Sequence, residues 1–250
     1  MLSLRGDRVV GRGVVTMRSR APLRQLAEDI WVAERPQAFY GLAVGTRMTV
    51  IRLPGERLLL HSPVALGTSL RAELDALGQV KYVIAPNRVH HLYAGKVAEI
   101  YPEARLWIAP GLERKRPDLQ FEAILDDESP DEWRAQVSQT FFRGRPYENE
   151  VVFCHHPSRT LLLCDLAFNF GPTAAAPTRL LMKLLRSYGS FGPSKLDPWL
   201  IRDRAAARRS LERILTWDFD RVVVAHGDIL ERGGHDALRT GYRWLLTPAA

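Results

Sequence analysis

The sequence predicts an α/β protein in which two β-sheets pack against each other with helices outside. Apolar strand hairpins occur near the start and in the middle of the chain, and alternating strands and helices follow each one. This alternation is typical of parallel strands with helices on the sheet faces. Because the order of hairpin and alternation occurs twice, we expect two sheets.

The first half supplies one hairpin and the elements of a parallel sheet. Residues 29–35 alternate as a strand does, and Pro54-Gly55 is a turn signal between two apolar runs, 47–53 and 57–61. These runs therefore predict two strands joined by a tight turn. Beyond them we expect a helix at 69–78 that ends at a glycine, a strand at 81–85, a helix at 92–101 that stops before Pro102, and a strand at 104–109.

The second half repeats this organisation with longer helices. Residues 133–142 favour a strand over a helix, and H-H-P-S-R separates two apolar runs that predict a second hairpin. The elements expected here are strands at 133–142, 150–154, 160–164 and 221–225, and helices at 177–188, 199–217 and 234–246.

The composition is that of one folded domain. The chain has 250 residues, of which 46% are hydrophobic, and it contains no internal repeat. Residues 1–22 are rich in Arg and Gly, so we expect a flexible N-terminal segment before a single domain at 23–250. Within that domain, residues 166–217 form a helical insert. We expect the insert to pack around the sheet edge; a lid, or an apolar face for a partner or membrane surface, is the alternative.

The net charge of +7 does not by itself indicate a nucleic-acid partner. The densest basic cluster, 204–209, has no interleaved aromatic residues, so we interpret it as a solvated helix face and expect no nucleic-acid binding. Two cysteines form no disulfide framework, no secretory signal precedes the domain, and no apolar run is long enough to span a membrane. We therefore expect a cytoplasmic protein without a transmembrane segment.

Polar side chains follow four of the expected strands at their carboxyl ends. His61 ends the first hairpin, A-P-N-R-V-H-H (residues 85–91) follows the 81–85 strand, Asp165 ends the second hairpin, and His226 follows the 221–225 strand. Ligands of α/β sheets gather beyond such ends. We therefore expect these side chains to converge.

The second hairpin places further residues by its antiparallel geometry. The start of its first strand lies beside the end of its second, so Glu148 and Glu150 are expected near Asp165. His155 and His156 lie at the hairpin tip, at the far end, and are interpreted as exposed turn residues outside the site.

Imidazole and carboxylate groups at one edge are the ligands of zinc, iron or manganese. A catalytic metal site keeps an open position at which water is activated, and a carboxylate such as Asp165 can bridge two ions. Each residue also has a structural interpretation: Asp165 as a cap of the next segment, His226 as part of a tight turn, and His91 as a core histidine. The metal hypothesis depends on their joint arrangement.

The order of these pieces resembles the metallo-β-lactamase fold. Residues 23–246 look more closely like an uncharacterised bacterial and plant family related to that fold, through R-M-T-V-I-R-L, H-S-P-V, A-P-N-R-V-H-H-L, H-P-S-R-T-L-L-L-C-D-L and V-V-V-A-H-G-D. The resemblance implies an αββα four-layer sandwich with a site along one edge of the sheets.

The superfamily's H-x-H-x-D-H motif is degenerate in this chain. When its last histidine is aligned with His91, its other three positions fall on Pro86, Arg88 and His90. The superfamily's next histidine falls near Pro146, close to Glu148. The bridging aspartate matches Asp165 and the final histidine matches His226, while His61 replaces an aspartate after the first hairpin. The motif positions that match are therefore His91, Asp165 and His226, and the resemblance implies either a rebuilt or single-metal site formed around them or a metal-free relic.

Two functions of different kinds follow. In the first, a metal-dependent hydrolase acts on a small-molecule substrate or anionic ligand; the metal ligands would be drawn from His91, Asp165, His226, His90, His61 and Glu148. Asp165, Arg88 and Asn87 are its catalytic candidates, and Arg88 or Asn87 would stabilise developing negative charge. In the second, the protein binds no metal, and its polar cluster supports the binding of a ligand or protein partner.

An oxidoreductase or glyoxalase-like activity is a third hypothesis, which no motif in the sequence favours. Gly-rich nucleotide loops and G-x-S-x-G are absent.

Overall fold

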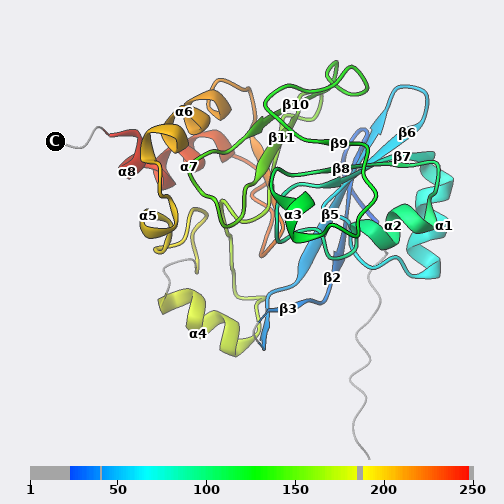
Figure 1. Ribbon diagram of the computed structural model, residues 1–250. Coiled ribbons are helices and arrows are strands. Elements are labelled where there is room, and N and C mark those ends of the chain that lie inside the picture. Colours follow the sequence, from blue (N-terminus) through cyan, green and yellow to red (C-terminus); the bar gives the residue numbers. More distant parts are fainter. Residues whose placement is uncertain (1–22, 40, 185–187, 248–250) are drawn as a thin grey trace, which may run out of the picture.

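Two β-sheets lie face to face at the centre of the computed structural model, which describes residues 23–39, 41–184 and 188–247 (Figure 1). The segment expected to be flexible, 1–22, lies outside the described residues. The seven-stranded sheet contains, in spatial order, β1 (Arg24–Ala27), β2 (Ile30–Arg35), β5 (Thr46–Leu53), β6 (Arg57–His61), β7 (Gln79–Ala85), β8 (Arg105–Ile108) and β9 (Ala123–Ile124). The four-stranded sheet contains β10 (Val137–Phe141), β11 (Val151–His155), β12 (Thr160–Leu163) and β13 (Arg221–Val224).

The strand pairing confirms both predicted hairpins and the parallel strands after them. β5 and β6 pair antiparallel, and β6, β7 and β8 then run parallel. In the other sheet β11 and β12 pair antiparallel, and β12 runs parallel to β13. The carboxyl ends of β6 and β7 therefore meet at one edge of the first sheet, and those of β12 and β13 at one edge of the second.

Helices cover the outer face of each sheet, which completes four layers and confirms the predicted αββα sandwich (Figure 1). The helices are α1 (Thr68–Leu77), α2 (Ala94–Ile100), α3 (Leu112–Lys115), α4 (Ala176–Leu184), α5 (Asp197–Leu200), α6 (Arg204–Ile214), α7 (Gly234–Gly241) and α8 (Arg243–Leu246). α1 and α2 bury Leu70, Leu74 and Val97 against the seven-stranded sheet. α6, α7 and α8 bury apolar side chains in the same way against the four-stranded sheet.

The alternation of side chains along β6 shows how one strand serves two cores. Leu58 and Leu60 pack toward the outer helices, whereas Leu59 faces the core between the sheets. His61 continues the inward face, where its ring meets Phe153 of β11 edge-on at 5.1 Å between centroids. The period of two therefore decides which strand-end residues enter the core between the sheets.

Four predicted elements differ from those in the structure. The helix expected at 92–101 spans only Ala94–Ile100, and the strand expected at 133–142 begins at Val137, because the preceding turn buries Trp133 between the sheets. The helix expected at 199–217 is two helices, since Asp203 caps α6 by accepting from the Ala206 amide at 2.9 Å. The helix expected at 234–246 divides at Tyr242 into α7 and α8.

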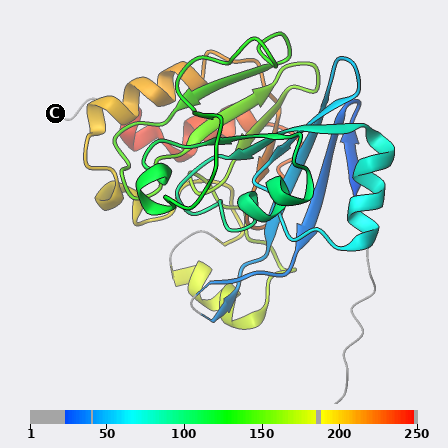
Figure 2. The same ribbon diagram turned by 45° about the vertical axis from the view of Figure 1, so that its right-hand side comes forward.

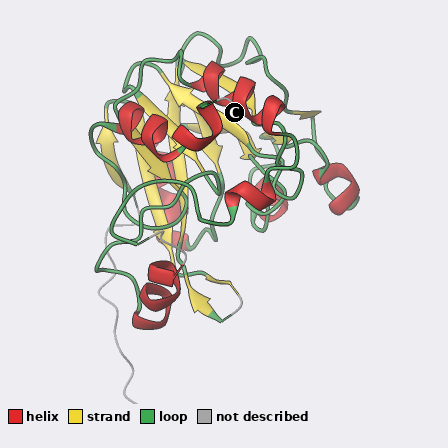
Figure 3. Ribbon diagram, turned by 90° about the vertical axis from the view of Figure 1, so that its left-hand side faces the viewer, coloured by secondary structure: helices red, strands yellow, loops and turns green. Residues whose placement is uncertain are grey.

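A small lobe projects from the sandwich (Figures 2 and 3). It consists of the two-stranded β3 (Ala38–Phe39) and β4 (Leu42–Ala43) together with α4, and we call this set the lobe. The Thr178 hydroxyl of α4 donates to the Ala43 carbonyl at 2.9 Å and joins its two parts. Within the described residues, no helix is long and apolar enough to cross a membrane.

Candidate metal centre

Three side chains from both sheets converge at the carboxyl ends of the parallel strands. His90 follows β7, Asp165 follows β12 and His226 follows β13. His90 Nε2 lies 3.2 Å from His226 Nε2 and 3.5 Å from an Asp165 carboxylate oxygen, while His226 Nε2 lies 3.7 Å from the other oxygen. They are the one group of three or more metal-capable side chains found in the described part of the chain. We call them the triad.

The loop after β7 is shaped by Asn87, which is completely buried. Its side-chain oxygen accepts from the backbone amides of Val89 at 2.8 Å and His90 at 2.6 Å. Its side-chain nitrogen donates to Asp165 at 2.8 Å and to Glu150 at 3.1 Å. Because both amide ends are engaged away from solvent, Asn87 holds the triad in place and has no donor left for a substrate.

Glu150 fixes the Asp165 segment from the start of the neighbouring strand, as the hairpin geometry predicts. Its carboxylate accepts from the backbone amides of Cys164 and Asp165, both at 2.7 Å. Burial and the negative charge of Asp165 raise the pKa of Glu150 to about 7. This buried carboxyl therefore acts through Asp165 rather than as part of the triad itself.

Hydrogen bonds on the far ring nitrogens orient both histidines of the triad. His226 Nδ1 lies 2.8 Å from the Gly45 carbonyl, which only accepts, so Nδ1 carries the proton and Nε2 presents a lone pair. His90 Nδ1 lies 3.0 Å from the Ser62 hydroxyl. Ser62 has a φ of 53°, an unfavourable value for a non-glycine residue, and such strain is concentrated at functional sites.

The turn that carries His226 is held by the first sheet. Arg47 of β5 donates to the carbonyls of Val224 and Gly227, the latter at 2.7 Å, and pairs with Glu34 at 2.9 Å. Gly227 has a φ of 88°, and a side chain there would collide with the backbone of Asn169. The His226 turn therefore depends on a glycine and on an arginine from the opposite sheet.

A buried arginine supports Asp165 from behind. Arg145 donates to the Asp165 carbonyl at 2.7 Å and pairs with Glu148 at 3.0 Å and Asp197 at 3.5 Å. Glu148, expected near Asp165, is thus close to it but pairs with Arg145 and is not part of the triad. Asp197 also accepts from the Tyr242 hydroxyl at 3.0 Å, which connects the triad to α8.

The three members of the triad differ in their affinity for protons. Burial opposes a charge on Asp165, but the charge and hydrogen bond of His90 hold the pKa of Asp165 well below its usual range. Burial has the largest single effect on His90 and lowers its pKa, but the charge and hydrogen bond of Asp165 and the charge of Glu150 together outweigh burial, and the net shift is upward. Burial and the neighbouring His90 charge lower the pKa of His226 to about 4. Without a metal, a proton therefore binds more readily to His90 than to His226.

The donor set fits a borderline divalent ion. A tetrahedral zinc ion with ligands about 2.0–2.1 Å away separates its ligand atoms by about 3.3–3.4 Å. In the triad the two Nε2 atoms are 3.2 Å apart. Asp165 approaches them through different oxygens, one 3.5 Å from His90 Nε2 and the other 3.7 Å from His226 Nε2. One ligand atom from each residue can be chosen so that all three lie within 4.8 Å of one another. Two imidazole nitrogens and one carboxylate, each with an outer hydrogen-bond partner, are a typical set with a fourth position open.

Two other predicted ligands lie outside the triad. His61 is buried with an Nε2 that has no hydrogen-bond partner, and burial together with the His90 charge lowers its pKa to about 3. His91 turns away from the triad, and its Nδ1 lies 3.2 Å from an Arg116 guanidinium nitrogen. The group expected from His91, Asp165 and His226 is therefore assembled with His90 in place of His91.

Arg88 belongs to a basic surface beside His91. Its guanidinium donates to the Pro146 carbonyl at 2.7 Å, and its own carbonyl accepts from Lys115 at 2.5 Å. Burial, followed by the charges of Arg88 and Arg116, lowers the pKa of Lys115. These three cations favour anionic groups at this surface.

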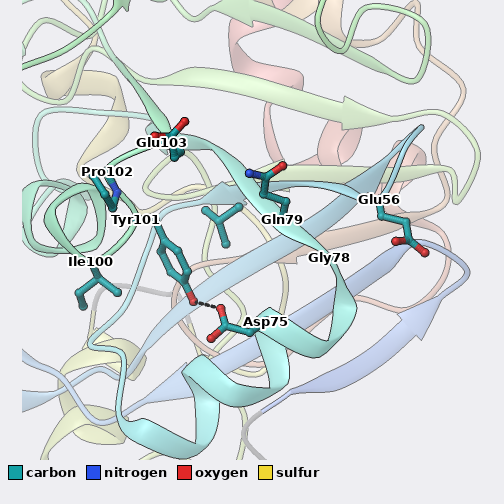
Figure 4. A pocket seen from close by; sticks show the side chains of 9 residues that line it. Glu56, Asp75, Gly78, Gln79, Ile100, Tyr101, Pro102 and Glu103 are labelled. Carbon is teal, nitrogen blue, oxygen red and sulfur yellow. Dashed lines mark hydrogen bonds between the residues drawn. The ribbon is translucent and has the colours of Figure 1, made fainter.

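The open hollow in Figure 4 is not part of this centre. It has a volume of about 490 Å³ and lies where β7 begins, at Gly78 and Gln79, whereas the triad follows the end of β7. Tyr101 donates to Asp75 there at 2.9 Å, and no histidine or cysteine lines it.

Sequence reasoning missed Arg47, Ser62 and Arg145 as supports of the triad. Arg47 and Ser62 stand in R-M-T-V-I-R-L and H-S-P-V, pieces that carry the resemblance, so those motifs held a signal. Arg145 in R-G-R-P has no pattern that distinguishes it from an exposed arginine.

Comparison with known proteins agrees with this fold. Residues 27–114 match a family described as Domain of unknown function (DUF4336). No curated protein matches the chain by sequence. The family match covers β2 to α3, and so includes His61, Asn87 and His90 but neither Asp165 nor His226.

Solved structures are similar over nearly the whole chain. A metallo-β-lactamase from Hirschia baltica has a TM-score of 0.60 at 11% identity and covers 91% of this chain and 98% of its own. The metallo-β-lactamase FIM-1 from Pseudomonas aeruginosa in the mono-zinc form has a TM-score of 0.59 at 10% identity, covering 90% and 96%. A metal-soaked Flv1 flavodiiron core from Synechocystis has a TM-score of 0.63 at 14% identity; it covers 89% of this chain, which spans 60% of that one.

Proposed function

Because this chain has the metallo-β-lactamase fold, we propose that His90, Asp165 and His226 bind a single divalent metal ion and that the protein is a metal-dependent hydrolase. The observation that carries the proposal is the triad, in which two Nε2 atoms and one carboxylate converge from both sheets. Zinc suits this donor set best, with iron and manganese as alternatives.

Neighbouring residues hold each member of the triad in a fixed orientation through hydrogen bonds. Gly45 and Ser62 orient the two imidazole rings, while Asn87 and Arg145 hold the side chain and the backbone of Asp165. When bound, the ion would supply Lewis-acid activation of water and polarisation of the scissile bond. Such outer hydrogen bonds raise metal affinity by keeping the ligands in position before the ion arrives.

A single ion is favoured over two. The positions where the superfamily carries its first two motif histidines hold Pro86 and Arg88, and Arg88 keeps a permanent positive charge. We propose that Arg88 and Lys115 attract an anionic group of a small ester, amide, thioester or phosphoester substrate. Asn87 is assigned to positioning, since it is buried with both amide ends engaged.

A metal-free cluster is the second candidate, and the same distances motivate it. A protonated His90 can donate to His226 at 3.2 Å and pair with Asp165 at 3.5 Å, which satisfies all three groups without an ion. In that case the protein would be a non-catalytic relative that binds a ligand or protein partner.

The two cysteines of the chain are unpaired and buried, in keeping with the cytoplasmic location expected from the sequence.

Metal content distinguishes the two candidates. Untagged protein purified without chelator is measured by inductively coupled plasma mass spectrometry, and we expect about one zinc, iron or manganese ion per chain. His226→Ala should lose that ion, whereas His235→Ala, which removes a histidine bonded to Leu215 outside the centre, should keep it. Wild-type protein that contains no metal and takes none up contradicts the proposal.

Hydrolysis is tested separately on the metal-loaded protein. A panel of small ester, thioester, amide and phosphoester substrates is assayed with and without chelator. Activity that chelator removes and added metal restores supports the hydrolase. Metal binding without any such activity would leave the metal site in place and refute the catalytic part.

A further inference from the structure

We propose that the lobe docks the protein on an anionic lipid membrane surface. This inference is independent of the metal centre, because it stands on the surface of α4 and the segment that follows it. Leu180 and Leu184 are 73% and 72% exposed, and a spacing of four places them on one face of α4. Large apolar side chains gathered on a projecting element mark an interaction surface.

The exposed apolar side chains continue beyond the helix. Lys195 Nζ lies 3.4 Å from the Leu184 carbonyl, which brings the next segment against the end of α4. Leu196 follows at 44% exposure and Trp199 at 74%. A tryptophan beside leucines and lysines is typical of the boundary between lipid tails and headgroups.

The positive charge of residues 166–196 favours an anionic partner surface. From Leu166 to Leu196 the sequence contains no Asp or Glu, while its basic residues are Arg179, Lys183, Arg186 and Lys195. Lys183 lies in α4, one residue before Leu184, so positive charge and apolar surface occur together. Such a combination is attracted by anionic headgroups and then held by burial of the leucines.

A membrane fits these features better than a second copy of the chain. The charged residues of the lobe, Arg179 and Lys183, are both basic, so two lobes brought together would repel each other electrostatically. The lobe also projects from the sandwich, a shape suited to a flat and deformable surface (Figures 2 and 3).

Docking would bring the triad's edge of the molecule toward the lipid. Gly45, whose carbonyl accepts from His226, follows β4 of the lobe by two residues. The segment without Asp or Glu, residues 166–196, begins directly after Asp165. The lobe and the triad are therefore connected through both chain segments.

Vesicle sedimentation tests the proposal with the full-length protein. Wild type should sediment with vesicles of phosphatidylcholine and phosphatidylglycerol, more weakly at high salt, and remain in the supernatant with phosphatidylcholine alone. The double variant Leu180→Gln/Leu184→Gln should bind at least roughly tenfold more weakly, because two leucines no longer enter the lipid. Lys183→Glu/Lys195→Glu should lose affinity by about fivefold or more per residue.

Matched controls separate the lobe from general effects. Ile124→Gln changes an exposed apolar residue on β9, and Arg209→Glu/Arg239→Glu reverses two charges on α6 and α7; both should bind as wild type does. Thermal melts establish that every variant is folded. The proposal is overturned if wild type ignores anionic vesicles, or if the control variants lose as much binding as the lobe variants. A dimer that Leu180→Gln/Leu184→Gln dissociates, without vesicle binding, would also overturn it.

Discussion

The loop after β7 presents two adjacent histidines to opposite surroundings: His90 lies between Asp165 and His226, whereas His91 lies against Arg116. Both side chains are buried, so burial alone does not distinguish them. Burial lowers the pKa of His90, but the Asp165 and Glu150 carboxylates together reverse the shift and raise it. Burial and then the charges of Lys115 and Arg116 lower the pKa of His91 to about 4.

The difference arises from the backbone between them. The Asn87 side chain accepts from the amides of Val89 and His90 and so fixes the direction in which His90 leaves the loop. His91 then begins the turn that leads into α2, and its amide bonds to the Val89 carbonyl at 3.0 Å. Which of two neighbouring histidines faces Asp165 and His226 therefore depends on one buried asparagine.

The largest expected effect contrasts the two histidines directly. His90→Ala should abolish stoichiometric metal binding, because it removes one of the three proposed ligands, whereas His91→Ala should keep the wild-type metal content. Mass spectrometry of both purified variants measures this. The reverse result, loss in His91→Ala and retention in His90→Ala, would show that the loop adopts a different direction in the metal-bound protein.

A second prediction removes the asparagine that sets the loop. Asn87→Ala should lower the free energy of unfolding by about 3 kcal/mol, because it leaves buried amides and carboxylates without partners. Urea denaturation measures the loss. Asn169→Ala removes a more exposed hydrogen bond to Asp228 and should cost under about 1 kcal/mol. Equal losses in the two variants would contradict the role assigned to Asn87.

Much of the fold could be predicted because it depends on local patterns. Apolar runs around Pro54-Gly55 and around 155–159 specify hairpins, and alternation specifies the parallel strands and the two layers of helices. The break before α6 has a local cause, the cap formed by Asp203, whereas the break between α7 and α8 was not predictable because it depends on tertiary contacts. Gly241 lies where a side chain would meet Pro193, and Tyr242 reaches the Leu166 carbonyl at 2.7 Å.

The candidate site was predictable in its location and less so in its membership. Strand ends located Asp165, His226 and the 85–91 loop, because side chains beyond parallel strands share one edge. Alignment with the degenerate motif favoured His91 as a member of the site, whereas the structure has His90 there. The spacing of residues in a motif does not specify the direction in which each side chain points. Arg145 gave no signal, because its burial results from ion pairs made by distant segments.

The second histidine pair gives a pH-dependent prediction. The expectation of an exposed turn residue at position 155 is wrong, because His155 ends β11 and is fully buried. Burial lowers its pKa to about 4 from an ordinary value near 6.5. The unfolded chain therefore binds a proton that the folded chain does not, so stability falls as the pH drops from about 6.5 to about 4. We expect His155 to account for about 2–3 kcal/mol of that fall. Urea midpoints at several pH values should show a shallower loss in His155→Gln; an unchanged slope would exclude His155 as the cause.

The smallest expected effect lies in the support of His90 by Ser62. Ser62→Ala removes the hydroxyl 3.0 Å from His90 Nδ1 and should weaken metal binding by about tenfold, the usual lower range for a second-sphere partner. Ser62→Gly removes the same hydroxyl but also relieves the positive φ, so it should weaken binding equally while being the more stable of the two. Competition with a chromogenic chelator measures affinity, and thermal melts measure stability. If Ser62→Ala binds metal as tightly as wild type does, the ring of His90 is held by Asn87 and Asp165 alone, and the contrast between the two histidines depends on the backbone of their loop.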